Sequence, residues 1–81
     1  MIKKISIQYF AILREEAGLS TETIESDAVD LAGLFRERSM CHNFSLSIDR
    51  LKVALNDEFC DWSRSFEEND RVVFIPPVAG G

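Results

Sequence analysis

Alternation of hydrophobic and polar residues predicts where this chain forms strands. Near the start, Ile5, Ile7 and Tyr9 alternate with polar neighbours, and a period of two is typical of a strand with one buried face. A more exposed second strand is predicted over residues 21–25, which are rich in threonine. Residues 71–75 are nearly all apolar, which predicts a central strand that is covered on at least one side.

Two segments carry apolar residues at helical spacing. A short helix is predicted directly after the first strand, with Gly18 as its C-terminal stop. The main helix is predicted to follow an N-cap at Asp27 and to end near Met40. Its apolar face consists of residues at i, i+3, i+4 and i+7 with two flanking positions, namely Ala28, Leu31, Ala32 and Phe35, widened by Val29 and Leu34.

The order of the elements predicts the fold class. After the main helix, residues 41–50 allow either a loop or a single helical turn. A strand over residues 51–55 and a short return strand over residues 59–62 flank the turn pair Asn56-Asp57. Strand, short helix, strand, long helix and then further strands indicate an α+β, ubiquitin-like β-grasp. In that fold one main helix crosses a small mixed sheet, and the last strand lies centrally, parallel to the first.

The last six residues are expected to form an extended tail. Proline cannot donate a backbone hydrogen bond, and a residue before proline is restricted to extended conformations, so a proline pair ends the last strand. Two glycines without side chains suit a tail that threads a narrow channel in another protein. A chain end that merely frays is the plainer alternative. We therefore divide the chain into a β-grasp domain, residues 1–75, and a tail, residues 76–81, which reads Pro76-Pro77-Val78-Ala79-Gly80-Gly81.

Length and charge narrow the classes of partner. The chain has 81 residues, enough for one small domain. Its net charge of -5 disfavours nucleic acid and anionic membrane as partners, because both require a positive surface. No segment is apolar for long enough to span a bilayer, and the first residues lack the pattern of a signal peptide. We therefore expect a cytoplasmic protein that docks onto other proteins.

Cysteine and histidine offer weak candidates for chemistry. Two cysteines, Cys41 and Cys60, are too few for a disulfide framework or a metal cluster. Cys41 and His42 are neighbours in sequence, so their side chains point in different directions and pair poorly as nucleophile and base. We interpret them as a cysteine at a helix end beside a solvent-exposed histidine, and Cys60 as a small packing residue.

Three segments of the chain resemble the small, sulfur-carrier subunit of molybdopterin synthase, in the MoaD/ThiS-like β-grasp family. They are residues 10–18, Phe-Ala-Ile-Leu-Arg-Glu-Glu-Ala-Gly, residues 53–56, Val-Ala-Leu-Asn, and residues 74–81, Phe-Ile-Pro-Pro-Val-Ala-Gly-Gly. The last is the most specific. The related thiamine sulfur carrier also ends in Gly-Gly, but it is usually shorter and lacks both the first segment and the proline pair.

This resemblance implies a function for the last residue. An adenylating enzyme of the ubiquitin-activating type would use ATP and magnesium to convert the Gly81 carboxylate to an acyl-adenylate. A sulfur donor protein would then displace AMP and leave a thiocarboxylate. Gly80 and Gly81 would finally enter the large subunit of molybdopterin synthase, where the sulfur passes to cyclic pyranopterin monophosphate. The family implies a heterotetramer, catalytic side chains in the partners, and no cofactor bound by this chain.

The resemblance also suggests how the chain docks. It implies an apolar patch near the base of the tail, formed by Phe10, Phe59 and Ile75 and continued by Pro76, Pro77, Val78 and Ala79. The alternative is that the first three are ordinary core residues. Other functions stay open as well: a sulfur carrier for thiamine, cysteine or tRNA thiolation, a ubiquitin-like protein modifier, or a plain β-grasp interaction module.

Overall fold

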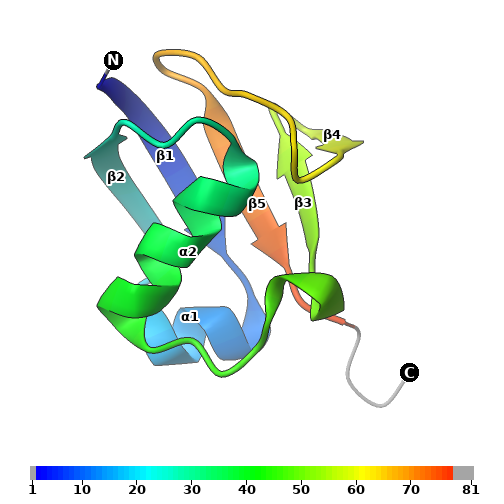
Figure 1. The fold of residues 1–81 in the computed structure, drawn as a ribbon. Helices are drawn as coiled ribbons and strands as arrows, with labels where there is room; N and C mark the ends of the chain where they lie inside the picture. Colours follow the sequence, from blue (N-terminus) through cyan, green and yellow to red (C-terminus); the bar gives the residue numbers. More distant parts are fainter. Residues whose placement is uncertain (1, 78–81) are drawn as a thin grey trace.

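The computed structural model describes residues 2–77 of the chain. In order, its elements are β1 (Lys3–Tyr9), α1 (Ala11–Ala17), β2 (Thr21–Ser26), α2 (Leu31–His42), the 3-10 turn η1 (Ile48–Arg50), β3 (Lys52–Leu55), β4 (Glu58–Cys60) and β5 (Arg71–Ile75). The strands form one five-stranded mixed sheet in the order β2-β1-β5-β3-β4, and α2 crosses one of its faces (Figure 1). This is the predicted α+β, ubiquitin-like β-grasp. No helix within residues 2–77 has the length and apolar character needed to cross a membrane.

β5 lies at the centre of the sheet, as predicted. It pairs in parallel with β1, from Ser6 opposite Arg71 to Tyr9 opposite Phe74, and antiparallel with β3 on its other side. Its side chains alternate between two covered faces: Phe74 is fully buried in the core, and Val73 is nearly buried on the opposite face. Cover on both faces explains why this strand is almost continuously apolar.

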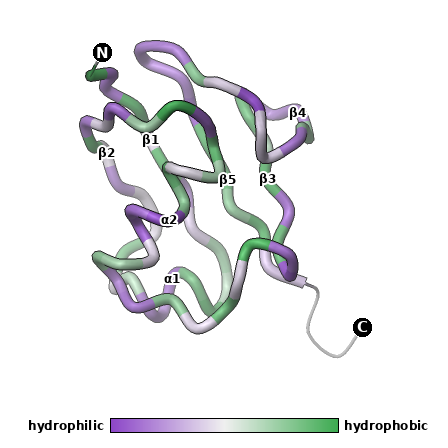
Figure 2. The backbone as a smooth tube through the Cα atoms, viewed as in Figure 1, coloured by the Kyte–Doolittle hydropathy of each residue, from purple (hydrophilic) through white to green (hydrophobic). Residues whose placement is uncertain are grey.

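The core fills the space between α2 and the sheet. The α2 helix contributes Leu31, Leu34 and Phe35, and the Phe35 ring meets the Phe74 ring edge-on at 5.1 Å. The strands contribute buried residues at alternate positions, namely Ile5, Ile7, Tyr9, Val53, Leu55, Val72 and Phe74. Figure 2 shows the hydrophobic colours running along β1, β5 and β3, with hydrophilic ones on the connection between β4 and β5.

The start of α2 corrects the predicted N-cap. Asp30, not Asp27, precedes the helix, and its carboxylate accepts a hydrogen bond from the Gly33 N–H at 2.9 Å. The first helical N–H groups, those of Leu31 and Ala32, donate to carbonyls in the segment between β4 and β5. Because these acceptors lie far away in the sequence, local pattern alone could not choose between the two aspartates.

Residues 27–30 therefore form a connection instead of the first helical turn. Ala28 still packs against the core, but Val29, predicted to widen the helical face, is 83% exposed. At its other end the helix continues past Met40 to His42, and Asn43 closes it in the left-handed conformation with φ 57°.

The segment between α2 and β4 combines both alternatives expected for residues 41–50. After the helix ends, Phe44 is buried and η1 makes a single turn. The hairpin that follows has Asn56 and Asp57 at φ 51° and 74°, as a tight turn between two strands requires. Its second strand is shorter than predicted, because Trp62 leaves the sheet and stacks on the core instead.

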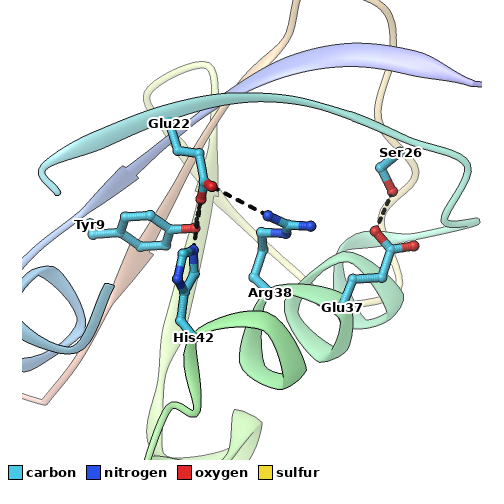
Figure 3. A network of polar contacts seen from close by, with 6 residues as sticks. All are labelled: Tyr9, Glu22, Ser26, Glu37, Arg38 and His42. Atoms are coloured by element: carbon cyan, nitrogen blue, oxygen red, sulfur yellow. Dashed lines mark hydrogen bonds and ion pairs between the residues drawn. The ribbon is translucent and has the colours of Figure 1, made fainter. Parts of the chain in front are cut away.

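A polar network joins the end of α2 to the sheet (Figure 3). The Glu22 carboxylate accepts a hydrogen bond from the Tyr9 hydroxyl at 2.6 Å and lies 3.0 Å from His42 Nε2. The second carboxylate oxygen of Glu22 lies 3.4 Å from the Arg38 guanidinium. The interpretation of His42 as a solvent-exposed residue is therefore wrong: its ring is half-buried and packs against Tyr9 and Phe44.

The network shifts two pKa values in opposite directions. Burial would raise the pKa of the Glu22 carboxyl, but hydrogen bonds from Tyr9 and His42, with the charges of His42 and Arg38, hold it below its ordinary value. Burial, aided by the hydrogen bond to Glu22, raises the pKa of the Tyr9 phenol far above its ordinary value. Both shifts favour an ionised Glu22 beside a neutral Tyr9 in the folded protein.

The cap assignment predicts unequal effects of two similar substitutions. Asp30→Ala should lower the free energy of unfolding by about 1 kcal/mol, because the Gly33 N–H loses its acceptor. Asp27→Ala removes an exposed carboxylate and should change the free energy of unfolding by less than about 0.5 kcal/mol. Urea titrations followed by circular dichroism measure both values. A larger loss for Asp27→Ala than for Asp30→Ala would contradict the assignment.

The Glu22 network predicts a dependence of stability on pH. At pH 7, Glu22→Gln should cost about 1–3 kcal/mol, because bonds to a charged acceptor are lost. The folded state lowers the Glu22 pKa, so its contribution is present above the usual value of 4.5 and is lost as the pH falls through the folded value. The stability difference between wild type and Glu22→Gln should therefore shrink below about pH 4.5. Denaturant titrations at several pH values measure this difference in the free energy of unfolding.

The control is Glu25→Gln, on the same strand and exposed. It should leave the dependence of the free energy of unfolding on pH the same as in wild type.

Candidate functional site

After Ile75, the last residue of β5, Pro76 and Pro77 leave the sheet at the end where α1 begins, here called the exit end. β1 and β5 are parallel, so their C-terminal ends lie at the same edge of the sheet (Figure 1). The last pair between β3 and β5 places Lys52 opposite Ile75. Pro76 and Pro77 have no N–H to donate, so pairing stops there. The fold therefore delivers the rest of the chain at the exit end.

The sheet face opposite α2 carries a smaller apolar group. Because side chains alternate, the neighbours of core residues in β3 and β5 lie on this face. Ala54 is opposite both Val73 and Phe59 across the strands. The Phe59 side chain is 70% exposed. An exposed aromatic residue beside an apolar sheet surface is typical of a protein interface.

Two shallow hollows flank the proline pair at the exit end. The strand-side hollow lies between β3, β4 and the end of β5, and is lined by Asp49, Arg50, Leu51, Lys52, Phe59, Ile75, Pro76 and Pro77. The helix-side hollow lies beside α1 and the approach to η1, and is lined by Ala11, Ile12, Glu15, Leu46, Arg50, Pro76 and Pro77. The chain thus leaves the fold between two partly apolar surfaces.

The structure brings four of the predicted docking residues together. Phe59, Ile75, Pro76 and Pro77 all line the strand-side hollow. Ile75 is half-buried, Pro76 is buried and Pro77 is exposed. The interpretation of Phe59 as a core residue is therefore wrong, because most of its side chain is exposed.

The other predicted site residues fall outside this hollow. Phe10 occupies the N-cap position of α1 in an extended conformation. Its side chain is 41% exposed at the exit end, but it lines neither hollow. The remaining predicted residues lie outside the described part of the chain, namely Val78, Ala79, Gly80 and Gly81.

Sequence reasoning did not select eight of the residues that line the hollows, among them Ile12, Leu46, Arg50 and Lys52. Ile12 alone of these four carried a signal in the sequence, because it lies off the helical face of its own segment. In the structure it is 40% exposed. The others lie in segments that no local pattern connects to the proline pair.

The cysteines and the histidine form no catalytic arrangement within residues 2–77. Cys41 is exposed, whereas His42 turns inward to Glu22. Burial raises the pKa of the Cys60 thiol, which disfavours the reactive thiolate. Among the described residues no three metal-ligating side chains are grouped so as to hold an ion.

Comparison with known proteins identifies the family. Residues 7–81 match the model of the ThiS family. The match spans nearly the whole chain, so the chain belongs to this family of sulfur carriers with a ubiquitin-like β-grasp fold. No curated protein matches the chain.

Several solved structures share the fold. A putative molybdopterin converting factor, subunit 1, from Pyrococcus furiosus is 27% identical, with a TM-score of 0.80 over 94% of this chain and 99% of that one. The small archaeal modifier protein 1 of Haloferax volcanii is 21% identical, with a TM-score of 0.80 over 94% and 99%. A chain from the complex of subunits 1 and 2 of the Helicobacter pylori molybdopterin-converting factor is 23% identical, with a TM-score of 0.64 over the full length of both.

The exposure of Phe59 predicts that it contributes little to folding. Phe59→Ala should change the free energy of unfolding by less than about 0.5 kcal/mol. Phe74→Ala, in the fully buried core, should cost about 3–5 kcal/mol. Urea titrations of the two variants test this contrast. A loss above about 1.5 kcal/mol for Phe59→Ala would mean that its ring supports the fold.

Proposed function

We propose that the chain is the small, sulfur-carrier subunit of a molybdopterin synthase. The observation that carries the proposal is the exit end, where the fold delivers the chain after Ile75 between two partly apolar hollows. The segment that leaves there, residues 74–81, is the one that most specifically resembles this subunit. The likeness to the Pyrococcus furiosus molybdopterin converting factor subunit supports the same choice.

In this role the reactive group is the carboxylate of Gly81. A carboxylate is a poor electrophile, so it first attacks the α-phosphorus of ATP and releases pyrophosphate. A sulfur donor then displaces AMP from the acyl carbon and leaves a thiocarboxylate. Two thiocarboxylates in turn give one sulfur each to cyclic pyranopterin monophosphate, so the two sulfurs of the molybdopterin dithiolene come from two carriers, and each carrier is left as the Gly81 carboxylate. Glycine at positions 80 and 81 lets the backbone pass through the narrow channels that these steps require.

The partners supply the catalytic side chains. An adenylating enzyme of the ubiquitin-activating type binds ATP and magnesium, a sulfur donor protein supplies the sulfur, and the large synthase subunit binds the pterin. We propose that two carriers sit on a central dimer of large subunits in the cytoplasm. Phe59 and Ile75 line the strand-side hollow beside the proline pair, which supports the proposal that they contact a partner that takes up Gly81. Phe10 stands at the same end of the sheet.

Deletion of Gly81 should abolish thiocarboxylate formation while the fold is kept, because the hydrophobic core is built from residues between Ile5 and Phe74. The protein is incubated with the adenylating enzyme, ATP and a sulfur source, and its intact mass is measured. Wild type should gain the mass difference between sulfur and oxygen. Lys4→Ala, exposed at the opposite end of β1, is the matched control and should gain the same. An unchanged wild-type mass would exclude every carrier function.

A second step separates the carrier pathways. Thiocarboxylated protein is mixed with the large synthase subunit and cyclic pyranopterin monophosphate, and molybdopterin is detected by its fluorescent oxidation product. A thiocarboxylate that yields no molybdopterin would point to another pathway, such as thiamine, cysteine or tRNA thiolation. Adducts joined through Gly81 to lysines of other proteins would point instead to a ubiquitin-like modifier.

A further inference from the structure

Arg50 is a charged residue that lines both hollows at the exit end. Only Arg50, Pro76 and Pro77 line both of these hollows. The backbone of Arg50 is held in place, because its N–H donates to the Ser47 carbonyl at 3.0 Å. The next residue, Leu51, is buried in the core. The guanidinium therefore projects from a fixed backbone beside the point where the chain leaves the fold.

Arg50 makes no ion pair within residues 2–77. The described ion pairs join Arg38 and His42 to Glu22, and Arg71 to Asp57, so neither Arg50 nor Lys52 takes part in one.

The nearest carboxylate in sequence, Asp49, makes no ion pair with Arg50. Asp49 accepts a hydrogen bond from the Ser47 hydroxyl in its own turn. That bond lowers the pKa of the Asp49 carboxyl, and the nearby charge of Arg50 lowers it further. Glu15 is the other carboxylate on the two hollows, and no hydrogen bond or ion pair joins its side chain to another of the described residues. The hollows thus carry two cations, Arg50 and Lys52, and two carboxylates, and no ion pair joins them among the described residues.

Covering this surface would make the unpaired charge costly. The hollows around Arg50 are largely apolar, with Ile12, Leu46, Ile75 and the prolines as neighbours. A protein that encloses the chain beyond Pro77 covers both hollows and removes water from the guanidinium. A buried cation is tolerated only when it is paired and hydrogen-bonded. The planar fork of arginine is best matched by a carboxylate.

We propose that Arg50 is a specificity-determining docking residue, and that the adenylating enzyme which takes up the end of this chain places an aspartate or glutamate against it. This inference rests on the proposed function. The adenylating enzyme is the chosen partner because activation of the Gly81 carboxylate is the first step in every carrier or modifier pathway considered for the chain. The carboxylate would select this chain over β-grasp proteins that lack a cation beside the proline pair.

Charge reversal at Arg50 tests the proposal. The dissociation constant between the adenylating enzyme and the full chain is measured by calorimetry at low and high salt. Arg50→Glu should weaken binding tenfold or more, because two carboxylates would face each other in a covered site. Arg50→Lys should weaken it less, since the charge is kept but the bidentate geometry is lost. The exposed Arg64→Glu, which changes the net charge equally and lines neither hollow, should bind within about twofold of wild type.

Each outcome decides the proposal. Equal weakening by Arg50→Glu and Arg64→Glu would show only general charge repulsion, and tight binding of Arg50→Glu would show no contact; either result overturns the inference. Recovery of Arg50→Glu binding by an acidic-to-lysine change on the enzyme would identify the carboxylate.

Formation of the wild-type thiocarboxylate is followed in the same samples. A wild type that is not thiocarboxylated overturns the proposed function together with this inference, whereas a reactive wild type with an unaffected Arg50→Glu overturns the inference alone.

Discussion

The parallel pairing of β1 with β5 is the constraint on which the rest of this structure depends. Parallel neighbours end at the same edge of a sheet, so the start of α1 and the residues after Ile75 meet at one end. An antiparallel β5 would release the chain beside the N-terminus, far from Phe10 and the loop before β3. The crossover that parallel pairing requires passes through α2, and that helix also covers the core.

The same strands serve the core and the docking surface on opposite faces. In β5, Phe74 is buried under α2, whereas its neighbour Ile75 lies beside the strand-side hollow. In β4, Cys60 packs toward the core while Phe59 stands exposed. A slip of one residue in register would exchange these faces. Core packing therefore fixes which apolar residues are offered to a partner.

The polar network and the exit end of this ThiS-family protein lie in different parts of the fold. The polar network around Glu22 stabilises the end of α2 and lies on the helix side of the sheet. The exit end instead combines apolar hollows with the unpaired charge of Arg50. One region thus maintains the fold, and the other offers a surface to a partner protein.

The sequence by itself determined the elements whose signals are local. Alternation located β1, a nearly continuous apolar run located β5, Gly18 stopped α1, and the proline pair ended the sheet. Each of these signals acts within a few residues of its cause. Tertiary structure alone decided features that join distant segments. Asp30 was selected over Asp27 by acceptors from beyond β4. His42 was drawn inward by Glu22, 20 residues earlier, and Arg50 reached the prolines because β3 pairs with β5. The periodicity of the sequence indicates only which face of a helix or strand a residue lies on. Which residue it contacts there depends on how the whole chain folds.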